Sequence, residues 1–225
     1  VDEEELIAAA VETEKLSRVD LYGIGTNLTC FSFIQADEEK MERLAEMRKK
    51  VENAAGHTLE IVSGGNSAAL DLMMRGGICE GVDNFRLGES LLFGKERSRY
   101  TFLPGTRNDG FILECEVVEA KVKPSLPWGT AGVDSYGRKP VFTNRGEKRK
   151  KVICAIGRQD FDAETATPVD EGILILGASS DHLMLDVTDS VKEYKVGDIV
   201  ELRLGYFSVL RAFTSPYVEK IFLKK

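Results

Sequence analysis

Two short segments of the chain each have the pattern of a strand that runs through glycine into a helix. They are residues 59–67 (LEIVSGGNS) and residues 84–90 (NFRLGES). A strand that ends in this way leaves backbone N–H groups and the positive end of a helix pointing at one place, which suits a dianion such as phosphate. Two consecutive units of this kind are typical of the phosphate site after the last two strands of a (β/α)8 barrel. The pair therefore predicts two walls of one phosphate site.

Arg86 lies in the second segment, two positions before Gly88. On a strand at that place, its guanidinium would face the ring of a bound ligand. The same arginine could instead be half of a buried ion pair. Asn66 and Ser67 could likewise serve only as a helix N-cap, a position that both residue types favour. The residues alone leave these alternatives open.

The first hundred residues alternate between helical and strand patterns. Helices are predicted from residue 2 through at least residue 11, at residues 38–52 and 67–75 and near residue 91, and strands at 21–27, 59–63 and 84–87. Strands separated by helices predict a parallel sheet. Three strands cannot close a barrel, which needs about eight. Because the chain starts at Val1, directly in a helical pattern, we expect an N-terminal portion to be missing.

The sequence changes character after Gly105. Strand patterns follow at residues 111–122, 151–156, 172–176, 183–187, 198–204 and 217–223. No helical periodicity is found there, and proline and glycine mark the turns, which predicts an antiparallel sheet or a small barrel. The predicted fold is thus α/β plus all-β, with residues 1–107 as the C-terminal part of a (β/α)8 TIM-type barrel and residues 108–225 as an antiparallel β-domain.

Composition excludes several classes of function. The net charge of −7 gives no general attraction to nucleic acid or to an anionic membrane. The basic run at residues 148–151 is therefore interpreted as the solvated end of a hairpin. The four cysteines have no C-x-x-C spacing, so we expect reduced thiols and no metal site. No apolar run is long enough to span a bilayer and no signal peptide is evident, which predicts a cytoplasmic protein.

Four motifs in order resemble a known family. Asn66 and Ser67 at a strand-to-helix turn, FRLG at 85–88, GASSDH at 177–182 and YKVGD at 194–198 are together similar to the alanine racemase class of pyridoxal-phosphate enzymes. Within that class, the ornithine racemase branch is most similar at residues 23–30 (GIGTNLTC), 63–67 (SGGNS) and 214–217 (TSPY). The resemblance covers essentially the whole chain.

The resemblance implies pyridoxal 5′-phosphate as the cofactor. Asn66 and Ser67, with the backbone amides near Gly88 and Glu89, would bind its phosphate, so residues 1–107 would be the cofactor-binding part. Arg86 would donate a hydrogen bond to the pyridine nitrogen and leave it unprotonated. A ring of that kind is a weaker electron sink and favours quick return of a proton to Cα. The implied reaction is racemisation of ornithine or a related basic amino acid.

Two departures from the family pattern bear on the mechanism. The family attaches its cofactor through a lysine on the first barrel strand, and no lysine here follows a first-strand pattern. We therefore expect the Schiff-base lysine to be absent and this chain alone to be inactive as a racemase. Alanine racemases also carry a tyrosine base just after an Ile-Gly pair in the β-domain, whereas Ile156 and Gly157 are followed here by Arg158.

A racemase with two bases still needs a proton carrier on the second face of the substrate. Asp160 and His182 are the candidates, with Cys154 and Tyr206 behind them. His182 has the more suitable intrinsic pKa, although a histidine in such a place is more often a core or interface residue than a proton carrier. It ends a segment in which Ser180 and Asp181 would meet the substrate carboxylate by the same resemblance.

The resemblance also implies a homodimer in which the β-domain of one subunit completes the site of the other. Asp160 or Asp162 could pair with the distal ammonium of ornithine or lysine. Two other functions remain open from the sequence. One is a non-catalytic pyridoxal-phosphate carrier or regulatory protein of the same fold, with which the missing tyrosine is compatible. The other is an amino-acid decarboxylase, which Arg86 disfavours because the resemblance leads us to expect an acidic residue there.

Overall fold

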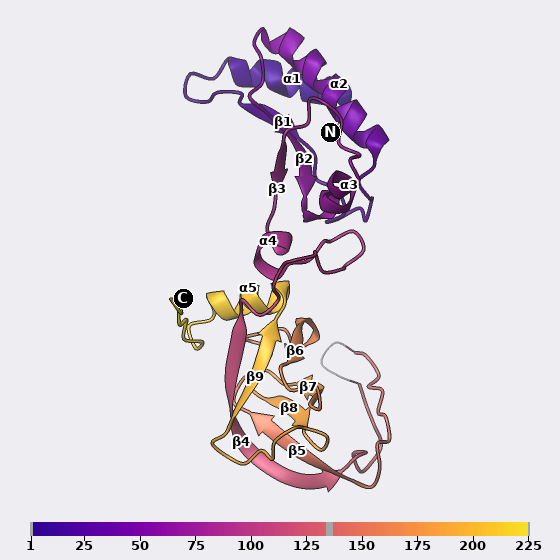
Figure 1. The fold of residues 1–225 in the computed structure, drawn as a ribbon, viewed down its shortest axis with the longest axis vertical. Helices are drawn as coiled ribbons and strands as arrows, with labels where there is room; N and C mark the ends of the chain where they lie inside the picture. The colour runs from indigo at the N-terminus through magenta and orange to yellow at the C-terminus, as the bar shows by residue number, and fades with distance from the viewer. Residues whose placement is uncertain (1, 134–136, 225) are drawn as a thin grey trace. The chain divides into compact units, whose positions relative to one another are not determined.

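The computed structural model of the chain describes residues 2–133 and 137–224. The chain divides into two compact units, which meet in sequence between Arg107 and Asn108 (Figure 1). Each unit has a hydrophobic core of its own. Val1, from which we expected a missing N-terminal portion, lies outside the described residues.

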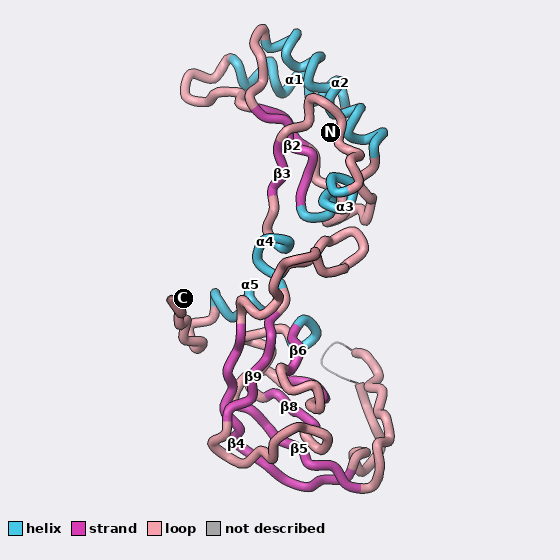
Figure 2. The backbone as a smooth tube through the Cα atoms, in the orientation of Figure 1, coloured by secondary structure: helices cyan, strands magenta, loops and turns pink. Residues whose placement is uncertain are grey.

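The first unit alternates helices with short parallel strands (Figure 2). Its elements are α1 (Glu3–Glu14), β1 (Gly23–Gly25), α2 (Glu38–Ala55), β2 (Ile61–Asn66), the 3-10 turn η1 (Ser67–Ala69), α3 (Leu70–Met74), β3 (Asn84–Arg86) and α4 (Glu89–Phe93). The strands form a parallel sheet in the order β1-β2-β3. The predicted parallel sheet is confirmed, and three strands do not by themselves show a TIM barrel.

Helix α2 supplies much of the core of this unit. It begins after Asp37, whose side chain accepts a hydrogen bond from the backbone N–H of Lys40, and it ends at Gly56 in the left-handed conformation. Its apolar stripe packs against the sheet, as the helical period of the sequence predicts. The buried residues of the stripe are Met41, Leu44, Met47 and Val51.

The second unit is a six-stranded antiparallel sheet in the order β6-β9-β4-β5-β8-β7. Its elements are β4 (Ile112–Pro124), β5 (Lys148–Cys154), the 3-10 turn η2 (Ala163–Thr165), β6 (Ala166–Pro168), β7 (Leu174–Ala178), β8 (Leu183–Asp186), β9 (Ile199–Leu204) and α5 (Tyr206–Thr214). The two end strands, β6 and β7, lie close to each other, so the sheet is nearly closed into a barrel. The predicted antiparallel β-domain is confirmed.

Strict alternation along β4 explains why this sheet has one buried face. Leu113, Cys115 and Val117 point inward, and the residues between them are exposed. They meet Val152 and Leu202, which are buried on the paired strands β5 and β9. The inward side chains of the barrel form one continuous core.

Three predictions for this unit were wrong. Residues 206–214 form helix α5, although no helical periodicity was found there. The sequence pattern did not indicate a helix because the segment is rich in aromatic and β-branched residues and buries mainly the small side chains Ser208 and Ala212. Residues 217–223, predicted as a strand, belong to no regular element. The basic run at 148–151 lies inside β5, and Arg149 is not solvated, because its side chain is only 13% exposed and pairs with buried Asp186.

Candidate active site

Arg86 is held across the carboxyl ends of the three parallel strands. From the end of β3, its Nη1 group donates a hydrogen bond to Ser63 Oγ on β2, and its Nη2 group donates one to the carbonyl oxygen of Thr26, 2.7 Å away, just after β1. The residue as a whole remains exposed. Both partners are neutral, and among the described residues Arg86 forms no ion pair, so the buried ion-pair alternative is wrong.

The two glycine-bearing turns contact each other directly, as the sequence predicts. Ser67 Oγ lies 3.1 Å from Ser90 Oγ and accepts a hydrogen bond of 3.2 Å from the backbone N–H of Ser90. Both serines are almost completely buried. The start of α4 is thereby joined to the end of β2, and the two segments form one surface.

Asn66 caps the turn that follows β2. Its Oδ1 atom accepts a hydrogen bond of 2.8 Å from the N–H of Ala68, and its Nδ2 group donates to Asn27 Oδ1 at 2.9 Å. The N-cap alternative is therefore observed for Asn66. Because the amide side chain already has partners, this residue would meet a ligand through its backbone rather than through its side chain.

Gly88 and Glu89 begin helix α4. Gly88 is exposed, and a Cβ atom added to it would meet no other atom within 4 Å. The carboxylate of Glu89 points away from solvent and accepts a hydrogen bond of 2.8 Å from Arg97 Nη1. This pairing raises the pKa of the Arg97 guanidinium above its ordinary value. Glu89 can therefore face a ligand only through its backbone.

These residues fit a cofactor that carries both a phosphate and a ring. The first N–H groups of a helix have no partner within the helix, and the space beside Gly88 is open. The hydroxyl groups of Ser67 and Ser90, 3.1 Å apart, join the two turns. Arg86, anchored by two neutral acceptors, offers its remaining N–H groups to a ring acceptor. The donor set matches a phosphate at one end and a pyridine nitrogen at the other.

In the β-domain, the residues after Ile156 lie against the turn between β7 and β8. The backbone N–H of Arg158 donates to the carbonyl of Ser179 at 2.8 Å, and a Cβ atom added to Gly157 would lie 2.2 Å from the carbonyl oxygen of Ser180. Only glycine permits this approach. The structure thus brings together the position of the missing tyrosine and the predicted segment that ends in His182.

Asp160 does not share the surface of that turn. It is 5% exposed, and its Oδ1 atom accepts a hydrogen bond of 2.6 Å from Ser215 Oγ. Asp162 is also occupied, because it accepts a hydrogen bond of 3.0 Å from Thr165 Oγ1. Asp160 thus holds the C-terminal segment in place, and Asp162 holds η2. Both carboxylates have a structural role.

Ser180, Asp181 and His182 are exposed on the turn between β7 and β8. Ser180 Oγ donates to Asp181 Oδ2 at 2.9 Å, and the turn is closed by the hydrogen bond of 2.8 Å from the N–H of Ser179 to the carbonyl of His182. Of the two candidates for the second base, only His182 is accessible to a solute.

Cys154 and Tyr206, the two further candidates for the second base, differ in their exposure to solvent. Cys154 is completely buried beside Cys115, and the hydrogen bond from Cys115 lowers its pKa. Tyr206 is 43% exposed at the start of α5. All four cysteines are free thiols. Cys154 is therefore a core residue.

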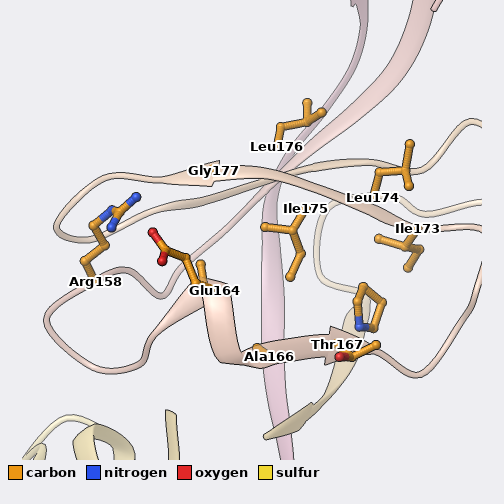
Figure 3. Close-up of a pocket in the computed structure, with 11 residues that line it drawn as sticks. Arg158, Glu164, Ala166, Thr167, Ile173, Leu174, Ile175, Leu176 and Gly177 are labelled. Carbon is orange, nitrogen blue, oxygen red and sulfur yellow. The ribbon is translucent and has the colours of Figure 1, made fainter. Parts of the chain in front are cut away.

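A separate cavity of about 480 Å³ opens between the end strands β6 and β7. Figure 3 shows that the side chains of Arg158 and Glu164 lie at one end of it, and that apolar residues such as Ile173 and Ile175 line the rest. Asp160 and His182 do not line this cavity. The predicted catalytic residues thus lie outside this cavity.

Three residues of the first-unit site were missed by sequence reasoning. Ser63 and Ser90 are the hydroxyl partners of Arg86 and Ser67, and Arg97 is the partner of Glu89. Ser63 and Ser90 lie inside the two segments that predicted the site, so their position was an available signal. In the described part of the chain, no cluster of side chains is suited to a metal ion, and no helix combines the length and apolar composition that crossing a membrane requires.

Comparisons with known proteins identify relatives of the chain. No family model matches the chain. Ornithine racemase from Acetoanaerobium sticklandii is 45% identical over 209 residues, which cover 93% of this chain and 59% of the relative. Lysine racemase from Thermotoga maritima is 42% identical over 214 residues, which cover 95% of this chain and 60% of the relative. The chain thus spans about three fifths of the length of these curated relatives.

Solved structures show the same fold. Alanine racemase from Streptomyces coelicolor matches with a TM-score of 0.54 at 16% identity, covering 94% of this chain and 53% of that structure. A D-threonine aldolase from Filomicrobium marinum matches with a TM-score of 0.55 at 11% identity, covering 90% of this chain and 50% of that structure. The two curated relatives and the structural neighbours together support an alanine racemase-like family of fold type III for this chain. Within it, the chain is a homologue of ornithine and lysine racemases, in a family whose members generally use pyridoxal phosphate.

Proposed function

We propose that the chain is part of a pyridoxal-phosphate-dependent racemase that acts on ornithine or a related basic amino acid. Its first unit would be a segment of a (β/α)8 barrel, and its β-domain would supply the second face of the site from the partner subunit of a homodimer. The named activities of the two curated relatives and the resemblance of the motifs support the proposal. We infer a cytoplasmic protein, with a small-molecule amino acid as its substrate.

The observation that carries the proposal is the anchoring of Arg86. A guanidinium with two fixed neutral acceptors keeps its orientation and its charge, so it donates a hydrogen bond to a ring nitrogen without giving up a proton. Pyridoxal phosphate, when bound, supplies an electron-withdrawing ring that stabilises negative charge at Cα. Arg86 would limit that withdrawal and thereby favour return of the proton.

The phosphate would be held by the surface that joins the two turns. Ser67 supplies a hydroxyl group, and Gly88 and Glu89 supply backbone N–H groups at the start of α4. Asn66 would contribute its backbone and shape the turn. These residues bind and orient the cofactor, and none of them moves a proton.

His182 is the better candidate for the second base. It is exposed, whereas Asp160 is buried and already accepts a hydrogen bond from Ser215. Exposed Asp181, next to it, accepts a hydrogen bond from Ser180 and can still offer its carboxylate to a substrate ammonium from the surface of the turn. We therefore assign the proton at Cα to His182 and substrate contact to Ser180 and Asp181.

Exchange of the Cα proton tests the proposal directly. The chain, and any longer polypeptide that carries it, is supplied with pyridoxal phosphate and with D- or L-ornithine, lysine or alanine in deuterated water. Proton NMR follows loss of the Cα signal, and chiral chromatography follows the opposite enantiomer. Exchange with ornithine or lysine in the longer polypeptide supports the racemase.

The other outcomes separate the alternative functions. Cofactor binding with no exchange in the longer polypeptide would favour the non-catalytic carrier, with which Arg158 in place of a tyrosine is compatible. Release of carbon dioxide would instead indicate a decarboxylase. Replacing Arg86 by Gln provides the matched variant, because it keeps a donor but removes the permanent charge.

A further inference from the structure

Arg97 connects both turns of the candidate phosphate site, although it belongs to neither. Its Nη1 group donates to Glu89 Oε2 at 2.8 Å, and its backbone N–H points to the carbonyl of Ser67 at 3.4 Å. Its guanidinium also lies 6.0 Å from the centre of the Tyr100 ring. The side chain is 34% exposed, so it borders the site rather than the core.

Glu89 poses an electrostatic problem for a phosphate site. Its side chain is only 9% exposed, and it directly follows Gly88 at the start of α4. A buried carboxylate in the same turn repels a dianion, and the repulsion is stronger away from bulk water. Without compensation, this surface would disfavour the ligand that its hydroxyl and N–H groups suit.

We propose that Arg97 is a positioning residue of the phosphate site, which neutralises Glu89 so that the surface accepts a phosphate dianion. The inference rests on the proposed function, because it assumes that the phosphate lies at these turns. The hydrogen bond fixes the Glu89 carboxylate toward Arg97. The ion pair is then electrically neutral, and the donors of Ser67 and Gly88 determine the potential at the site.

A double-mutant cycle on Arg97 and Glu89 tests this role. Replacing Arg97 alone leaves the charge of Glu89 uncompensated and should weaken phosphate binding. Replacing Glu89 as well removes that charge and should restore phosphate binding. A residue that binds phosphate directly would not be rescued in this way. The cycle therefore distinguishes compensation from direct contact.

The test compares pyridoxine 5′-phosphate with pyridoxine. Neither has an aldehyde, so surface lysines cannot capture them. Binding to the full 225-residue chain is measured by equilibrium dialysis at mildly alkaline pH, where a carboxylate stays ionised. We expect Arg97→Gln to weaken binding of the phosphate ester on the order of tenfold, and to leave pyridoxine unchanged. Arg97→Gln combined with Glu89→Gln should return to within about twofold of the wild type.

Two further variants serve as controls for this binding measurement. Arg97→Lys keeps the charge and should bind as the wild type does. Glu89→Gln alone should bind the ester at least as tightly as the wild type, and it decides the matter if Arg97→Gln fails to fold. The proposal is overturned if Arg97→Gln binds normally, if the double variant stays as weak as Arg97→Gln, or if Glu89→Gln weakens binding. A wild-type chain that binds ester and pyridoxine equally would overturn the phosphate site itself, which is a separate result.

Discussion

The two units of the chain are stabilised in different ways. The first unit has a parallel sheet of three short strands, and β1 and β3 each have one edge that pairs with no other strand in the described residues. The second unit has six antiparallel strands whose end strands lie close together. Unpaired edges leave backbone groups open to exchange, whereas a nearly closed barrel protects them.

The two units also differ in where their candidate functional residues lie. In the first unit, Arg86, Ser67 and Ser90 are fixed by hydrogen bonds at the ends of strands. In the second, the accessible residues lie on a turn over a complete core, and the buried carboxylate Asp160 is part of the support. The candidate cofactor residues therefore belong to the unit whose sheet is less complete.

Hydrogen exchange should show the largest difference between the units. We expect the backbone amides of β4, β5, β8 and β9 to exchange roughly 10³-fold more slowly than those of β1 and β3, because local opening costs less at an unpaired edge. Mass spectrometry of the full chain after timed labelling measures this. Equal protection in the two sheets would show that the first unit gains its stability from something other than its strand pairing.

Asp186→Asn should produce the largest loss from a single substitution. Burial raises the pKa of Asp186, but hydrogen bonds from Arg149 and Thr188 outweigh that effect and hold the pKa below its ordinary value. We expect a loss of about 3 kcal/mol in unfolding free energy at neutral pH, because the substitution breaks a largely buried ion pair and leaves Arg149 with exposed Asp189 as its acidic partner. Chemical denaturation measures it.

The pH dependence of this variant checks its cause. A lowered carboxylate pKa contributes stability above the unfolded value, and that stability is lost as the pH falls through the folded pKa. The difference between Asp186→Asn and the wild type should therefore shrink below about pH 4. Glu193→Gln, at an exposed carboxylate that pairs with Lys150, is the control and should change little. A difference that is constant with pH would mean that packing, not charge, accounts for the loss.

Much of this could be predicted from the sequence, and the failures have physical causes. Glycine turns and alternating patterns are local, so the parallel sheet, the antiparallel domain and the contact between residues 59–67 and 84–90 were predictable. The burial of Asp160 was not, because its partner Ser215 is 55 residues away. Helix α5 was hidden because its sequence YFSVLRAFT has strong β propensity. The partner of Glu89 was missed because Arg97 lies in a loop without a pattern.

Asp160→Asn and His182→Gln should separate structural support from proton transfer. We expect Asp160→Asn to lower stability by about 1.5 kcal/mol, because the hydrogen bond from Ser215 loses its charged acceptor, and to leave the ornithine-to-alanine preference unchanged. His182→Gln should leave the melting temperature unchanged and reduce Cα exchange. Thermal unfolding and the NMR exchange assay measure both. If Asp160→Asn changed the substrate preference, Asp160 would have to be assigned to the substrate site after all.

Ser63→Ala should have the smallest effect on stability and a distinct effect on the ring. It removes one of the two acceptors of Arg86 and leaves only the carbonyl of Thr26, so we expect a stability loss of about 0.5 kcal/mol. In bound pyridoxine 5′-phosphate labelled with 15N, the chemical shift of the ring nitrogen should change toward the value of the free ligand in water. Ser90→Ala is the matched control, since it removes a hydroxyl group of the phosphate side and should leave the ring signal in place. If the ring signal of Ser63→Ala equals that of the wild type while Arg86→Gln shifts it, Thr26 alone holds the guanidinium, and the first unit needs fewer side-chain contacts than the comparison implies.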